Sequence, residues 1–166
     1  ENPIIQSIDI TGVKNKTVLE LLKDNLILKE KNPFVENKVR RDEIKLKNIL
    51  KINGYYFSEI KSKVKNNLNN TIDLKYEIDL GEKAYISSIK FIGDKKIKDR
   101  KLKNIIVSEE SKFWKFISKK KFIDSNRIKL DEKLLKNYYK NNGYYNVKIY
   151  SSFAQLIDSN NFELVF

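Results

Sequence analysis

The sequence of 166 residues contains neither cysteine nor histidine. Without cysteine the chain forms no disulfide, offers no thiolate nucleophile and supplies no sulfur ligand to a metal ion. Without histidine it lacks the most usual general base and the commonest metal-binding side chain. Serine–histidine and cysteine–histidine catalytic arrangements are therefore excluded.

Glycine is scarce as well, and long apolar runs are absent. No two of the five glycines lie within ten residues of each other, so there is no glycine-rich phosphate loop. No stretch approaches the roughly 20 apolar residues of a membrane-spanning helix. We interpret the adjacent acids Asp42-Glu43 and Asp131-Glu132 as favourable charges in the first turn of a helix, because adjacent helical residues point apart. The sequence thus predicts a non-enzymatic protein with no catalytic, cofactor-binding or metal-binding residues.

Lysine, in contrast, is abundant. The chain has 34 basic and 22 acidic residues, a formal net charge of +12, and 30 of the basic residues are lysine. Such a charge is typical of proteins that bind nucleic acid or an anionic membrane surface. Phosphate recognition usually also recruits arginine. We therefore favour a compositional bias that spreads lysine over the solvated faces, and do not expect nucleic acid as a partner.

A stretch of 18 residues occurs twice, at 39–56 and at 128–145. The copies share Asp-Glu, Lys-Asn and Asn-Gly-Tyr-Tyr at matching positions. Their common apolar positions recur with the spacing of one helical stripe. The glycine that follows favours a helix C-cap, although Asn-Gly could also form a hairpin turn. The chain is therefore organised as two copies of one unit.

The elements around each copy follow the same order of strand, helix, helix, strand, strand. In the first copy the expected strands and helices cover residues 4–11, 17–28, 39–53, 55–65 and 72–80. In the first strand, Ile4, Ile8 and Ile10 are expected on one face. Ile89–Gly93 repeats the pattern of Ile8–Gly12, so we expect domains at 1–82 and 83–166. The third strand of the second domain is truncated at the end, which predicts a piece of a longer protein.

Tandem units of this kind resemble POTRA repeats. The resemblance is carried by Ile-x-Ile/Phe-x-Gly before the first helix, Asn-Gly-Tyr after the second, and Gly81-Glu82 after the last strand. The pair is most similar to the second and third repeats in the BamA family of outer-membrane assembly factors, where the third also has a tryptophan-bearing insert. The resemblance implies an α+β fold in which each domain is a three-stranded mixed sheet with the third strand central. Two antiparallel helices would cover one face of that sheet.

The same resemblance implies a location and partners. It implies a scaffold in the periplasm of a Gram-negative bacterium, tethered to the outer membrane through a C-terminal β-barrel of the same chain. The partners implied are unfolded outer-membrane proteins, accessory assembly lipoproteins, further POTRA units and that barrel. A related secretion or translocation barrel is the alternative.

A sheet with helices on one face leaves its strand edges open, and an extended peptide can add to such an edge by β-augmentation. The second strand of each copy is the candidate edge. In the first copy its outer face carries Lys61, Lys63 and Lys65, which discourages edge-to-edge pairing. In the second copy we expect Lys148, Tyr150, Ser152 and Ala154 on the outer face, which is less guarded. The predicted protein-binding residues are Val147, Lys148, Ile149, Tyr150, Ser151, Ser152 and Phe153.

The second copy also carries eight extra residues between its two helices, around 112–121. Phe113, Trp114 and Phe116 lie there among lysines. One interpretation of aromatic side chains among lysines is a second binding surface, for nucleic acid or lipid. We favour the other interpretation, a loop whose aromatic side chains pack against the two helices or the neighbouring domain, because a lone tryptophan is usually buried in part.

Overall fold

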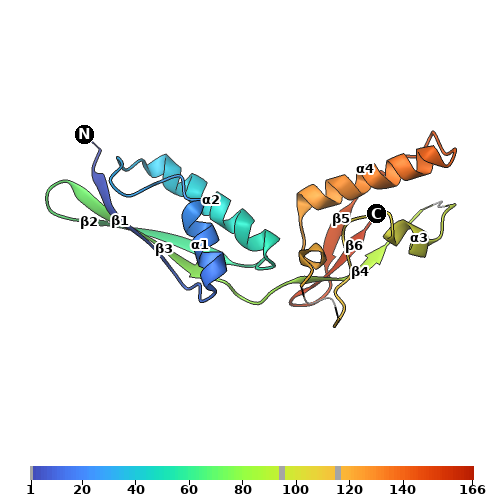
Figure 1. The fold of residues 1–166 in the computed structure, drawn as a ribbon, viewed down its shortest axis with the longest axis horizontal. Helices are drawn as coiled ribbons and strands as arrows, with labels where there is room; N and C mark the ends of the chain where they lie inside the picture. Colours follow the sequence, from blue (N-terminus) through green and yellow to red (C-terminus); the bar gives the residue numbers. More distant parts are fainter. Residues whose placement is uncertain (1, 94–95, 115–116) are drawn as a thin grey trace. The chain divides into compact units, whose positions relative to one another are not determined.

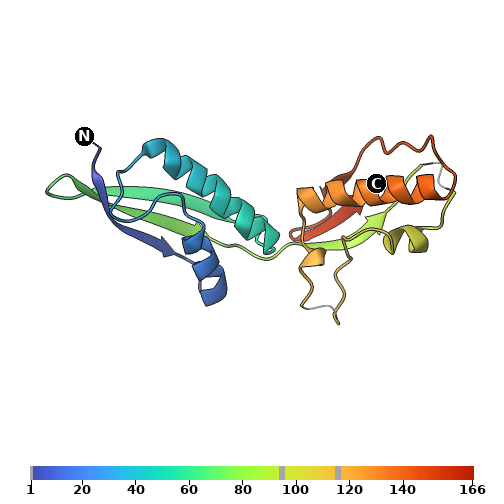
Figure 2. The ribbon, with the colours of Figure 1, turned by 45° about the horizontal axis from the view of Figure 1, so that its top comes forward.

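The computed structural model describes residues 2–93, 96–114 and 117–166. Its contacts divide the chain into two compact units (Figures 1 and 2). The first unit comprises Glu1–Lys51 and Phe57–Glu82, and the second comprises Ile52–Tyr56 and Lys83–Phe166. The division at residues 82 and 83 that we expected from the sequence stays a prediction.

The first unit has the expected order of elements. They are β1 (Ile4–Thr11), α1 (Lys16–Asp24), α2 (Glu36–Ile52), β2 (Glu59–Asn66) and β3 (Thr71–Asp79). The sheet order is β1-β3-β2, with β1 parallel and β2 antiparallel to β3. The third strand is therefore central and the sheet is mixed, which confirms the implied fold.

The second unit repeats this topology with shorter strands and a shorter first helix. They are β4 (Tyr85–Lys90), α3 (Asp99–Lys103), the 3-10 helix η1 (Lys119–Lys121), α4 (Ser125–Asn141), β5 (Phe153–Leu156) and β6 (Asn161–Val165). The sheet order is β4-β6-β5, again with a parallel and an antiparallel pair. β2 and β5 are thus edge strands of their sheets.

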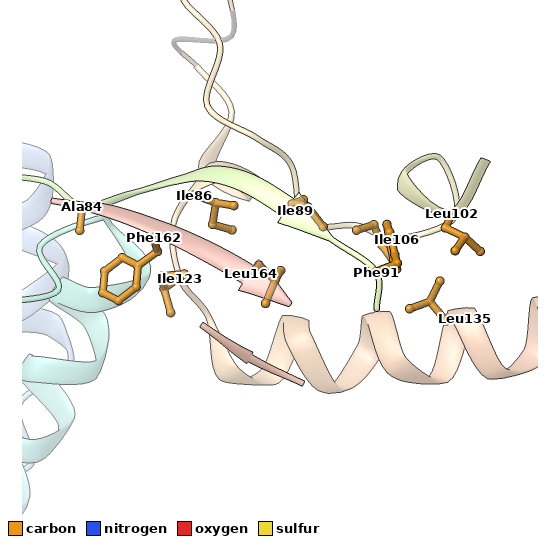
Figure 3. Close-up of a cluster of buried hydrophobic side chains, with 10 residues drawn as sticks. All are labelled: Ala84, Ile86, Ile89, Phe91, Leu102, Ile106, Ile123, Leu135, Phe162 and Leu164. Atoms are coloured by element: carbon orange, nitrogen blue, oxygen red, sulfur yellow. The ribbon is translucent and has the colours of Figure 1, made fainter. Parts of the chain in front are cut away.

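Each central strand alternates between a buried face and an open face. On β3, Ile72, Leu74 and Tyr76 are almost fully buried, as are Leu46 and Leu50 on α2. The second unit has a matching core, drawn in Figure 3, with side chains from β4, β6, α3 and α4. Its members are Ala84, Ile86, Ile89, Phe91, Leu102, Ile106, Ile123, Leu135, Phe162 and Leu164. The helices therefore cover one face of each sheet and leave the other open.

The first strand of each unit departs from strict alternation. Ile5 and Ile10 are the buried isoleucines of β1, because the register shifts between Ile5 and Ser7. The expectation that Ile4, Ile8 and Ile10 share one face is therefore wrong, since a β-bulge changes which residues point inward. β4 has the corresponding shift between Ile86 and Ser88.

Polar partners from distant segments satisfy the two bulges. The Ile8 N–H donates to the Glu30 carboxylate at 3.1 Å, and the Ile89 N–H donates to the Glu110 carboxylate at 3.0 Å. Serine hydroxyls beside each bulge donate to acids on the central strand: Ser7 to Asp73 at 2.6 Å and Ser88 to Glu163 at 2.8 Å. Each bulge is therefore stabilised by side-chain hydrogen bonds, and both units have the same arrangement.

The Asn-Gly-Tyr-Tyr turn after α2 belongs by its contacts to the second unit. The Ala84 N–H donates to the Gly54 carbonyl at 2.9 Å. The Tyr56 ring meets the Phe162 ring edge-on, with centroids 4.9 Å apart. Gly54 itself has a φ of 99°, the left-handed conformation that favours glycine at a helix C-cap.

Candidate functional site

β5 is the edge strand nearest to the predicted binding residues. Ile157 donates its N–H to the Asn161 carbonyl at 2.8 Å, which identifies these two residues as a hydrogen-bonded pair of the β5–β6 hairpin. In an antiparallel ladder such pairs alternate with pairs whose N–H and C=O groups point away from the partner strand. Phe153 and Gln155 therefore bond to β6. Ala154 and Leu156, opposite Leu164 and Phe162, direct their N–H and C=O groups outward.

The strand that we expected over 147–153 begins only at Phe153. Phe153 lies opposite Val165, and the stretch from Val147 to Ser152 lies outside the strand. The prediction that residues 147–152 form part of the edge strand is therefore wrong.

The side-chain faces of this strand are also the reverse of those expected. Ala154 packs against the core cluster and the Ser152 hydroxyl is buried, whereas Phe153 lies on the open face with 47% of its surface exposed. Val64, which occupies the position of Ala154 in the first unit, follows Gly54 by ten residues. Ala154 follows Gly143 by eleven. A difference of one residue moves every side chain to the opposite face of a sheet.

The remaining predicted binding residues precede β5. Ile149 packs against the core cluster, whereas Tyr150 is 91% exposed. The Val147 N–H donates to the Tyr144 carbonyl at 3.3 Å, in a turn after α4. Lys148 and Ser151 are exposed. The seven predicted residues thus lie along one continuous segment that leads into the edge strand.

The lysines predicted to guard the first edge lie on the open face of the first sheet. Lys61, Lys63 and Lys65 are opposite Glu77, Lys75 and Asp73. The Lys63 ammonium lies 2.7 Å and the Lys75 ammonium 3.1 Å from the Glu77 carboxylate. Hydrogen bonds from these two lysines lower the pKa of Glu77. The first edge therefore carries three lysines, one of which, Lys63, is held in an ion pair.

The corresponding positions in the second unit are largely uncharged. Counted along the register of the two hairpins, Ser151, Phe153 and Gln155 occupy the places of the three guarding lysines. One ion pair lies nearby, between the Lys90 ammonium and the Glu163 carboxylate at 2.7 Å. The Lys90 hydrogen bond, followed by that of Ser88, lowers the pKa of Glu163. An apolar side chain, Phe153, thus stands where the first unit has an ion-paired lysine.

The insert of the second unit exposes its apolar side chains. Phe113, Trp114 and Ile117 are 86%, 57% and 88% exposed. The Phe113 and Trp114 rings meet edge-on at 4.5 Å, and the Lys112 ammonium lies 5.6 Å from the centre of the Trp114 ring. Phe116, also predicted for this surface, lies outside the described residues. The interpretation that we favoured, in which the insert's aromatic side chains pack away from solvent, is therefore wrong for Phe113 and Trp114.

Two buried aspartates were not recognised from the sequence as core residues. Asp42 is fully buried and accepts the N–H groups of Ile27 at 2.6 Å and Leu28 at 3.1 Å, and the Tyr76 hydroxyl at 3.1 Å. Burial and the neighbouring Asp42 raise the pKa of Tyr76. Our interpretation of Asp42 as a first-turn charge is wrong, because α2 begins six residues earlier, at Glu36.

Asp131 repeats this arrangement in the second unit. It is fully buried and accepts the N–H groups of Val107 at 2.6 Å and Ser108 at 3.2 Å. Its first-turn assignment is wrong for the same reason, since α4 begins at Ser125. The recurrence of aspartate on the apolar stripe, three residues after Val39 or Ile128, was the signal available in the sequence. Both carboxylates hold the backbone between the two helices.

The described parts of the chain contain no group of three acidic side chains placed to hold a metal ion. They also contain no helix with the length and apolar character needed to cross a bilayer.

Comparison with known proteins identifies a family over nearly the whole chain. The sequence model of the POTRA family, described as a surface antigen variable number repeat, matches residues 3–81 and again 84–166. The outer membrane protein assembly factor BamA of Neisseria meningitidis is 27% identical over 152 residues, 90% of this chain but 19% of that protein. The chain thus spans about a fifth of the length of this curated relative.

Solved structures share the fold. POTRA repeats 3–5 of Haemophilus influenzae BamA match 98% of this chain and 59% of that one, with a TM-score of 0.58 and 16% identity. POTRA repeats 1–3 of Omp85 from Anabaena match 98% and 60%, with a TM-score of 0.61 and 9% identity. At these identities the similarity establishes the fold alone.

Proposed function

The chain belongs to the POTRA family, and from this premise we propose that it is a non-catalytic periplasmic scaffold of an outer-membrane protein assembly machine. The curated relative is named as an assembly factor of outer membrane proteins, which supports this assignment. In this proposal the chain receives unfolded β-barrel clients. It docks accessory lipoproteins, and is joined to further POTRA units and to a membrane β-barrel of the same protein.

The edge of β5 is the observation that carries the proposal. Ala154 and Leu156 direct their N–H and C=O groups away from β6, on the side of the sheet where no further strand is paired among the described residues. An extended client segment can bond to these groups as a fourth strand. The side chain of Phe153, on the open face, would contact the apolar residues of that segment.

The chemistry of such an edge suits clients of many sequences. Main-chain hydrogen bonds are the same for every residue except proline, so affinity depends little on client sequence. Strands of outer-membrane barrels alternate apolar and polar side chains, and one apolar face of such a strand could cover Phe153. We propose that a longer client segment would also contact residues 147–152, which lead into this edge. We expect weak binding that tolerates sequence changes.

Titration with barrel-strand peptides tests the proposal. A peptide of about ten residues, the length of one transmembrane β-strand, is added to the 166-residue chain while amide shifts are followed by NMR. We expect the shifts to centre on Ala154 and Leu156 and to extend toward Ile149. Ala154→Pro removes one outward donor and should weaken binding about tenfold.

Val64→Pro is the matched control on β2. Asn67 donates its N–H to the Thr71 carbonyl at 2.9 Å, so by the same alternation Val64 also directs its N–H outward. This variant removes an equivalent donor from the guarded edge and should leave binding unchanged. Leu156→Pro provides a second test at β5 if Ala154→Pro lowers the unfolding midpoint. Shifts that cluster on Lys61–Lys65, or binding that survives both β5 variants, would contradict the proposal.

A further inference from the structure

The insert of the second unit is a closed loop whose base is held by hydrogen bonds. The Glu109 N–H donates to the Lys120 carbonyl at 3.1 Å, and the Ser111 N–H donates to the Ile86 carbonyl at 2.7 Å. After the loop, Phe122 and Ile123 are buried. The chain therefore leaves the folded unit and returns to it at defined points, and Figure 2 shows the described parts of this loop extending away from the sheet and α4.

The apolar side chains of the insert's described residues are exposed to solvent. Phe113, Trp114 and Ile117 are all more than half exposed, and lie within five residues of one another. Burying a large apolar side chain is favourable, so three exposed together favour contact with an apolar medium. A protruding tip fits a medium that it can enter, whereas peptides are usually bound along grooves and sheet edges.

The charged residues within the loop are all basic, although Glu109, Glu110 and Asp124 flank it. From Ser111 to Ile123 the sequence has five lysines and no acidic residue. Lys112, Lys119 and Lys120 are exposed there, although Lys119 donates to Asn53 and Lys120 lies 3.7 Å from Glu109. The excess extends to the whole second half, since residues 83–166 carry 19 basic and 9 acidic residues and residues 1–82 carry 15 and 13. The basic charge of the chain is thus concentrated around the insert's own unit.

We propose that this tip, formed by Lys112, Phe113, Trp114 and Ile117, anchors the second unit to the surface of an anionic lipid bilayer. The two rings and the isoleucine enter the headgroup region, where aromatic side chains are well accommodated, and the lysines remain among the anionic headgroups. This site is separate from the β5 edge and takes a different partner. The result of a lipid-binding experiment on this site is therefore independent of peptide binding at the β5 edge.

Trp114 is the only tryptophan of the chain, so its fluorescence reports directly on the tip. The 166-residue chain is mixed with vesicles of phosphatidylcholine containing phosphatidylglycerol, and with vesicles of phosphatidylcholine alone. We expect a blue shift of the emission, and quenching by lipids brominated near the headgroup, only with the anionic vesicles. The response should weaken as salt is raised, because the lysine contribution is screened.

Two pairs of variants separate the apolar and the electrostatic parts. Phe113→Ser with Ile117→Ser keeps the tryptophan and should lower vesicle affinity by about tenfold or more. Lys112→Gln with Lys120→Gln should lower it about thirtyfold, since each of the two lysines near an anionic surface contributes about 1 kcal/mol. The control, Lys129→Gln with Lys133→Gln on α4, changes the net charge equally at two exposed lysines and should retain most of the affinity.

Three results would overturn the proposal. Absence of binding to anionic vesicles at low salt is the first. Binding without any change in Trp114 emission, or an equal loss in the α4 control, would show that the whole basic surface acts and the tip does not. A Trp114 shift caused by a barrel-strand peptide but not by vesicles would assign the tip to a protein partner.

Discussion

The two units repeat their internal contacts and differ on their solvent-facing side. In each unit an aspartate of the long helix accepts backbone N–H groups of the preceding segment, and a glutamate accepts the N–H freed by the bulge of the first strand. On the open face, however, Lys63 of the first unit is replaced by Phe153 of the second. The shared contacts hold the backbone of a POTRA repeat, whereas the faces that meet solvent are free to take different partners.

The largest effect is expected at the buried aspartates. Asp42→Ala leaves two N–H groups and the Tyr76 hydroxyl without their acceptor, and should destabilise the first unit by about 4 kcal/mol. Asp131→Ala leaves only backbone N–H groups without an acceptor and should destabilise the second unit by about 3 kcal/mol. Native-state hydrogen exchange, read separately for the amides of each unit, measures both values.

Glu20→Ala, an exposed acid on α1, is the control for loss of charge and should change stability by less than about 0.5 kcal/mol. If the two aspartate variants were no more damaging than this control, the carboxylates would not be structural.

The core leucines should give similar losses in the two units. Leu46 and Leu135 occupy the same position of the repeated helix and are 0% and 2% exposed. Leu46→Ala and Leu135→Ala should each cost about 2–5 kcal/mol through lost burial and the cavity left behind. Denaturant unfolding of each variant checks this. An unfolding midpoint like that of the wild type for either variant would mean that its helix does not cover the sheet.

Tyr76 distinguishes the first core from the second. The register of the central strands places Phe166 at the corresponding position of the second unit, where it stacks on Phe91 at 5.6 Å. Tyr76→Phe should therefore make the first core resemble the second and cost about 1–2 kcal/mol, the contribution of its hydrogen bond to Asp42. Thermal unfolding at neutral pH measures the difference.

The raised pKa of Tyr76 adds a dependence on pH. Because the folded state favours the neutral phenol, the stabilisation is complete below the unfolded pKa of 10.0 and is lost progressively as the pH rises above it. Unfolding curves from pH 8 to 11 should therefore show a steeper alkaline loss in the wild type than in Tyr76→Phe. Parallel curves for the two proteins would contradict the assignment.

The smallest effect in stability is expected from exchanging the two edges. Phe153→Lys with Gln155→Lys gives β5 the lysines of β2, and Lys63→Phe with Lys65→Gln does the reverse. We expect about a fivefold loss of barrel-strand peptide affinity in the first variant and a gain at β2 in the second. Unfolding midpoints should change little in both. Equal peptide affinity in the two variants and the wild type would mean that the lysines do not guard the edge.

Local patterns in the sequence were sufficient for the order of the elements and for their repetition. Helical spacing and the glycine after each long helix predicted α2 and α4, and alternation predicted β2 and β3, within a few residues of their observed ends. These signals lie within one element, so they can be interpreted without knowing what the element packs against. The family followed from the same signals, because two copies at matching spacing carry more information than either motif.

The candidate sites were only partly predictable. In the segment leading to Phe153, the expected inward and outward faces were reversed at Ser152, Phe153 and Ala154, because a single extra residue after Gly143 changes the register. Asp42 was placed at a helix start because its acceptor role depends on Ile27, Leu28 and Tyr76, which lie 14 to 34 residues away. The aromatic insert was recognised, but its exposure could not be decided from composition.

The sequence by itself therefore determined two units that resemble POTRA repeats, their element order, and the contrast between an edge with three lysines and a less guarded one. Tertiary structure alone decided which backbone groups of β5 point outward, which carboxylates are buried, and that Phe113 and Trp114 face solvent. The reason is physical. Helix caps and periodicity are properties of neighbouring residues, whereas strand register and burial depend on groups that only the folded chain brings together.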